Sequence, residues 1–139
     1  MQLLALTASA LALAGSAVAQ ESARFGGVSV YPTTVKVGET FTVHYNSTTA
    51  VHQPKYYDAY IQGTDANGFI QPPYLLQRTV FPTDGTKNVY FNTTVPPIGL
   101  GQNVSHLIWA YVTYPVDNTP DAPLEYAGVS TGIYVDVPY

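Results

Sequence analysis

The segment Thr-Phe-Thr-Val-His-Tyr, residues 40–45, decides the fold of this chain. The apolar Phe41, Val43 and Tyr45 alternate with polar residues, so they share one face of an extended segment. Alternation with a period of two is typical of a β-strand that buries one face and exposes the other. The Val-Gly-Glu tripeptide at 37–39 predicts a turn before it. The sequence therefore predicts a half-buried strand over 40–45.

The same kind of pattern recurs along the chain. Val, Ile, Thr and aromatic residues fill short windows, and Gly and Pro residues between them predict turns. The expected strands are 27–31, 40–45, 56–62, 74–81, 87–95, 106–114 and 129–137. The window 106–114 is apolar on both faces, so we expect a central strand with Trp109 as a core anchor. These windows predict an all-β fold: an antiparallel, immunoglobulin-like two-sheet sandwich of about seven strands, with a closed barrel as the alternative.

The composition excludes several classes of protein. The chain has 139 residues and no cysteine, so it has no disulfide, no cysteine zinc site and no thiol nucleophile. Five Lys and Arg against nine Asp and Glu give a formal charge of −4. An acidic chain is a poor match for nucleic acid or an anionic membrane surface. Only 10% of the residues are charged, against about 25% in typical soluble domains.

The first residues predict a secretory signal peptide. An apolar stretch over 3–14 is followed by small residues and by Ala17-Val18-Ala19, a suitable cleavage site. The stretch is shorter than the ~20 apolar residues that span a bilayer. We expect a signal peptide over 1–19, a β-sandwich domain over 20–139 and a secreted, extracellular protein without a membrane span. An uncleaved interfacial anchor is the alternative.

Three sequons agree with a secretory route. Asn46, Asn92 and Asn103 each begin an Asn-X-Ser/Thr tripeptide without proline in the middle. An attached glycan must face water, so each occupied asparagine marks an exposed position. The sequence therefore predicts a eukaryotic secreted glycoprotein.

Catalytic and metal-binding patterns are weak. His44, His52 and His106 form no closely spaced ligand pair, so we expect no metal and no cofactor. The chain lacks a Gly-X-Ser-X-Gly nucleophile motif, and no pair of acids is marked as catalytic. Asp65-Ala-Asn-Gly is similar to the start of a calcium loop, but without a later glutamate it favours an ordinary turn. We therefore expect no enzyme.

Tyrosine is the main functional signal. Tyr56, Tyr57 and Tyr60 lie close together in one expected strand, and exposed tyrosines supply contact area for a protein or a polysaccharide. These three residues are the candidate binding surface. The alternative is that tyrosine fills the core and the strand surfaces of a chain with few charges.

Five stretches resemble the necrosis-inducing secreted protein family of fungi. They are Ala-Arg-Phe-Gly-Gly-Val at 23–28, Pro-Thr-Thr-Val-Lys-Val-Gly-Glu-Thr-Phe-Thr-Val at 32–43, Asn-Thr-Thr-Val-Pro at 92–96, the strand 107–114 and the ending 132–137. The resemblance implies a non-enzymatic virulence effector that binds host proteins such as receptor-like kinases. It would suppress pattern-triggered plant immunity or induce cell death. A cell-wall or glycan-binding module that uses exposed tyrosines is the alternative function.

Overall fold

The structure is a computed structural model that describes residues 23–97, 104–117, 119 and 121–137. It contains eight strands, named here in chain order. They are β1 (Gly27–Tyr31), β2 (Thr34–Lys36), β3 (Thr40–Asn46), β4 (Tyr56–Thr64), β5 (Tyr74–Val80), β6 (Asn88–Thr94), β7 (Ser105–Pro115) and β8 (Leu124–Asp136). Among the described residues, no helix is long and apolar enough to cross a membrane.

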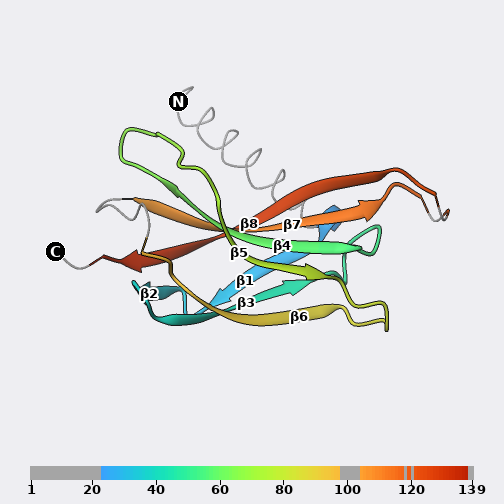
Figure 1. Ribbon diagram of the computed structural model, residues 1–139, viewed down its shortest axis with the longest axis horizontal. Helices are drawn as coiled ribbons and strands as arrows, with labels where there is room; N and C mark the ends of the chain where they lie inside the picture. The colour runs from blue at the N-terminus through green and yellow to red at the C-terminus, as the bar shows by residue number, and fades with distance from the viewer. Residues whose placement is uncertain (1–22, 98–103, 118, 120, 138–139) are drawn as a thin grey trace, which may run out of the picture.

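The strands form two sheets (Figure 1). The larger sheet has five strands in the order β2–β8–β7–β4–β5, and the smaller sheet has the order β1–β3–β6. Paired strands run antiparallel, except that β2 runs parallel to β8. The predicted all-β, two-sheet sandwich is therefore confirmed. The short β2 was not predicted, although its Val35 is fully buried.

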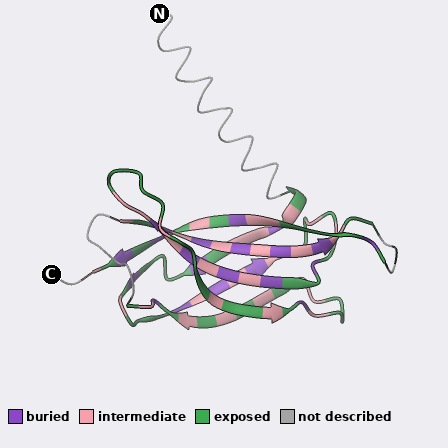
Figure 2. Cartoon of the chain, turned by 45° about the horizontal axis from the view of Figure 1, so that its top comes forward, coloured by how far each residue is buried: buried purple, intermediate pink, exposed green. Residues whose placement is uncertain are grey.

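Alternation along the strands places apolar residues between the two sheets, as the burial colours in Figure 2 show. Phe41, Val43 and Tyr45 of β3 are buried, whereas the residues between them are exposed or half-buried. Val129, Ile133 and Val135 of β8 follow the same rule. The half-buried strand expected over 40–45 is therefore confirmed.

Strand β7 lies in the middle of the larger sheet, as predicted. Among its inward residues, Ile108, Ala110 and Val112 are fully buried. Trp109 lies on the opposite face and is half-buried, so the expected core anchor is a wrong prediction. The physical reason is that both faces of this strand are apolar, and the smaller side chains face the tightly packed interior.

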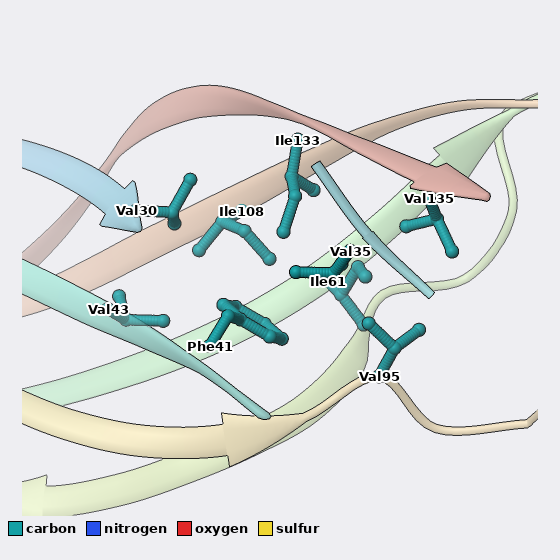
Figure 3. Packing of buried hydrophobic residues seen from close by; sticks show 9 residues of the cluster. All are labelled: Val30, Val35, Phe41, Val43, Ile61, Val95, Ile108, Ile133 and Val135. Atoms are coloured by element: carbon teal, nitrogen blue, oxygen red, sulfur yellow. The ribbon is translucent and has the colours of Figure 1, made fainter. Parts of the chain in front are cut away.

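The core has two adjoining parts. Figure 3 shows the aliphatic part, in which side chains from both sheets point toward one another around Phe41. Its members are Val30, Val35, Phe41, Val43, Ile61, Val95, Ile108, Ile133 and Val135. The second part is aromatic and contains Tyr45, Tyr57 and Phe81 among its buried residues.

Tyr45 and Tyr57 join the two sheets in the aromatic part. Their rings stack with centroids 5.1 Å apart, and Phe81 meets Tyr45 edge-on at 5.9 Å. The Tyr45 hydroxyl donates a hydrogen bond of 2.6 Å to the backbone carbonyl of Phe25. Burial raises the pKa of both phenols well above the usual value, so both stay neutral. This contact links the two sheets in a chain that has no cysteine to form an inter-sheet disulfide.

His106 is a polar residue on the inward face of β7. It is 4% exposed, and neither ring nitrogen has a hydrogen-bond partner among the described residues. Its Cα partners are Gly63 of β4 and Ile133 of β8. Burial lowers the pKa of His106 below its ordinary value of 6.5, because the charged form is poorly solvated there.

This burial predicts that the protein loses stability as the pH falls below about 6.5. The unfolded chain takes up a proton at His106 at a higher pH than the folded chain does. The free energy of unfolding therefore decreases from pH 7.5 to pH 5, and a His106→Phe variant shows a flatter dependence. Urea denaturation at several pH values measures both. If the free energy of unfolding changed with pH by the same amount in the wild type and in His106→Phe, the burial of a neutral imidazole at His106 would be contradicted.

Candidate functional site: an aromatic patch on the larger sheet

Four aromatic side chains contact one another on the outer face of the larger sheet. They are Tyr60 of β4, Trp109 and Tyr111 of β7 and Tyr126 of β8, and we call them the aromatic patch. Tyr111 is the centre: its ring centroid lies 5.5 Å from Tyr60, 5.5 Å from Trp109 and 6.2 Å from Tyr126. The Tyr60 contact is edge-to-face, and the Trp109 contact is stacked.

The register of three strands brings these rings together. Trp109 pairs with Tyr60 across β4 and β7, whereas Tyr126 of β8 pairs with Thr113, one outward position beyond Tyr111. Tyr126 is 73% exposed, and the other three rings are half-buried. Burial, followed by the nearby Tyr126 and Tyr60, raises the pKa of Tyr111, so its hydroxyl stays protonated and able to donate a hydrogen bond.

Gly128 makes room for the rings. It is the partner of Tyr111 in the β7–β8 register. A Cβ atom at this position would lie 2.9 Å from Tyr111 Cε1 and 3.1 Å from Trp109 Cε3. The two rings therefore lie over the bare backbone of β8, an arrangement by which aromatic residues cover glycine in a sheet.

A hollow of about 300 Å³ adjoins the aromatic patch. It is lined by Asp58, Tyr60, Pro73, Tyr111 and Tyr126. The carboxylate of Asp58 accepts two hydrogen bonds of 3.0 Å from Nε and Nη2 of Arg78 on β5. This pairing raises the pKa of Arg78 and fixes both polar groups beside the rings. The site thus combines flat apolar rings with a carboxylate, a guanidinium and tyrosine hydroxyls.

The predicted binding surface is only partly present here. Of Tyr56, Tyr57 and Tyr60, only Tyr60 belongs to the aromatic patch. Tyr57 is fully buried between the sheets, because neighbouring residues of a strand point to opposite faces. Tyr56 shares the outer face with Tyr60 and is 46% exposed, but it lies roughly 13 Å farther along the strand. The contacts of Tyr111 with Tyr60 and Tyr126 were not predicted from the sequence, because they depend on how the strands pair.

The histidines lie on different elements and faces. His44 points outward from β3 and stacks on Tyr90, His52 stacks on Tyr114, and His106 is buried inside. Within the described residues, no group of three or more His, Asp or Glu side chains is placed to hold a metal ion. Asp65 acts as a turn residue: its Oδ1 accepts hydrogen bonds from the backbone N–H groups of Asn67 and Phe69.

A serine and a histidine that sequence reasoning left apart come together on the smaller sheet. Ser29 Oγ lies 3.3 Å from His44 Nδ1, and His44 Nε2 lies 2.8 Å from Asn88 Oδ1. The order resembles a nucleophile, a base and an orienting group. The row is exposed, so water competes for both contacts, and we interpret it as polar cross-strand pairing.

Two of the three sequon asparagines lie on the smaller sheet. Asn46 of β3 and Asn92 of β6 both lie on its outer face, half-buried and exposed respectively. Asn103 and the expected signal peptide 1–19 lie outside the described residues.

Comparison with known proteins supports the fold. No protein-family model matches the chain, and no curated protein matches it in sequence. The chain is similar to superoxide reductases (neelaredoxins) from Ignicoccus hospitalis; one such structure has a TM-score of 0.50, 18% identity and 87% coverage of each chain. Two others have a TM-score of 0.47 and 19% identity, over 78% of this chain and 79% or 80% of theirs. At such identities the likeness describes the fold.

These comparisons correct the expected function. The family resemblance implied a fungal effector that binds receptor-like kinases, whereas the solved structure that is similar over 87% of each chain is a superoxide reductase. The effector function is therefore a wrong prediction. The resemblance to the necrosis-inducing family stays a prediction, since no family model tests it.

A redox enzyme that uses a metal requires side chains that can hold the metal. Transition-metal centres are held by several convergent His, Cys or carboxylate ligands. The chain has no cysteine and three histidines, and in the described part these histidines do not converge. The side chains that the structure describes therefore do not fit a metal centre.

The aromatic patch generates a prediction at Gly128. We expect Gly128→Ala to displace Tyr111 and Trp109, because its methyl group would overlap both rings. Trp109 is the single tryptophan of the chain, so its emission wavelength and quenching report the displacement. Gly132→Ala is the matched control on the same strand, since nothing lies within 4 Å of a Cβ atom there. The same Trp109 spectrum in both variants would contradict the described packing.

Proposed function

We propose that this chain is a non-covalent binding protein that holds a polysaccharide on the aromatic patch. The supporting observation is the contact of four aromatic rings on one sheet face, beside a hollow lined by Asp58, whose carboxylate pairs with Arg78. The proposal concerns binding, and assigns no bond-making or bond-breaking step to the chain.

Sugar rings match this combination of groups. A pyranose has C–H groups on its two faces and hydroxyl groups around its edge. Tyrosine and tryptophan offer a flat apolar surface for the C–H groups, and the tyrosine hydroxyl adds a polar tip. Tyr60, Tyr111 and Tyr126 line the hollow, so one sugar ring can lie against them while a neighbouring sugar extends over Trp109.

The polar groups at the border recognise hydroxyls. Asp58 lines the hollow, and its carboxylate accepts two hydrogen bonds from Arg78, whose side chain is 68% exposed. A carboxylate accepts hydrogen bonds from sugar hydroxyls, and a guanidinium donates them. A few fixed polar groups beside an apolar surface are typical of ligand sites.

The charge of the chain favours a neutral ligand. The formal charge is −4, and the one described guanidinium at the patch is already paired with Asp58. A polyanion would be repelled by the overall charge. We therefore propose a neutral polysaccharide such as a glucan or chitin. A secreted location, predicted from residues 1–19, would place the protein where such polymers occur.

The proposal predicts that removing the central ring weakens binding. An aromatic contact contributes about 0.5–1.5 kcal/mol, so Tyr111→Ala should raise the dissociation constant about two- to twelvefold. Trp109 fluorescence during titration with glucan and chitin oligosaccharides measures the dissociation constant. Removal of the protein from solution by the insoluble polymers provides a second measurement.

Tyr90→Ala is the control for this experiment. Tyr90 is 63% exposed on the outer face of the smaller sheet, so its loss removes a surface tyrosine without touching the aromatic patch. We expect wild-type binding from this variant. The proposal is wrong if no polymer depletes the protein or changes Trp109 emission, or if Tyr90→Ala binds as weakly as Tyr111→Ala.

A further inference from the structure

We infer that Asn46 and Asn92 carry N-linked glycans that together cover the outer face of the smaller sheet. The two asparagines lie on adjacent strands, β3 and β6. The register pairs Thr42 with Asn92 and Asn46 with Asn88, so both sequon asparagines lie on the same outer face, with the row of His44 and Tyr90 between them.

The local geometry suits modification at both positions. Asn46 Oδ1 accepts a hydrogen bond of 2.8 Å from the backbone N–H of Thr48, and Asn92 Oδ1 accepts one of 2.8 Å from Thr42 Oγ1. Both contacts use the carbonyl oxygen, whereas a glycan attaches to the amide nitrogen Nδ2. Thr48 and Thr94, which complete the two sequons, are exposed.

The composition of this face is consistent with a glycan cover. None of the three strands of the smaller sheet contains Asp, Glu, Lys or Arg. Tyr31 and Tyr90 are nevertheless 79% and 63% exposed on it. Glycans at Asn46 and Asn92 would supply the polarity that this uncharged surface lacks, and would limit contact of its tyrosines with other proteins.

The transfer step needs a donor from the eukaryotic secretory pathway. A lipid-pyrophosphate-linked oligosaccharide supplies the sugar. The bond from the anomeric carbon to the phosphate oxygen breaks, a bond from that carbon to Asn Nδ2 forms, Nδ2 loses a proton, and the lipid pyrophosphate leaves. Entry into this pathway relies on the signal peptide predicted over 1–19.

The glycans and the aromatic patch lie on opposite faces of the molecule. The inner faces of the two sheets pack against each other, so their outer faces point in opposite directions. Glycans at Asn46 and Asn92 therefore extend away from Tyr60, Trp109, Tyr111 and Tyr126. The aromatic patch stays accessible in the glycosylated protein.

Intact-mass measurement of the secreted protein tests this inference. The full chain is produced in a eukaryotic secretory host with Asn103→Gln, which removes the third sequon. We expect two glycan masses that a peptide N-glycosidase removes. Asn46→Gln and Asn92→Gln should each lose one of them, whereas Asn88→Gln on the same face but outside a sequon should lose none.

The contrary results are equally clear. Retention of the chain inside the host without modification, or secretion with one or neither asparagine occupied, would overturn the inference. The fraction of protein that an insoluble polysaccharide removes from solution should be the same before and after glycosidase treatment. A larger fraction after treatment would contradict the placement of the glycans on the face opposite the aromatic patch. The mass measurement does not depend on polysaccharide binding, so each proposal can fail alone.

Discussion

The stacking of Tyr45 on Tyr57 across the space between the two sheets is the contact on which the rest of the structure depends. The chain has no disulfide to hold the sheets together, so side-chain burial supplies the attraction. Burying a large apolar side chain contributes about 1.5–3 kcal/mol, and an aromatic pair adds about 0.5–1.5 kcal/mol. Once these residues face inward, the period of a strand sends their neighbours outward.

That constraint gives the two outer faces different chemistry. The larger sheet presents Tyr60, Trp109, Tyr111 and Tyr126 as contacting rings, with Gly128 beneath two of them. The smaller sheet presents asparagine, serine and threonine without charged residues. The similarity to a superoxide reductase is a similarity of the two-sheet fold. The chemistry of the two outer faces depends on the side chains of this chain.

The inward and outward positions of β3 and β8 were predictable, because alternation is a local property of each strand. Alternation over 56–62 likewise puts Tyr57, Ala59 and Ile61 on one side of β4, and all three are buried. Treating Tyr57 as a surface residue conflicted with this pattern. Trp109 could not be placed, since both faces of β7 are apolar. The aromatic patch depends on register between β4, β7 and β8, which no single window of sequence contains.

The central claim is that the outer face of the larger sheet, and not that of the smaller sheet, binds a polysaccharide. Two-dimensional NMR of the ¹⁵N-labelled protein, titrated with a soluble oligosaccharide of the polymer that depletes it, tests this directly. The account predicts that amide shifts change around Tyr60, Tyr111 and Tyr126 and stay constant around His44, Tyr90 and Asn92. Shift changes centred on β3 and β6, or spread evenly over both sheets, would contradict it.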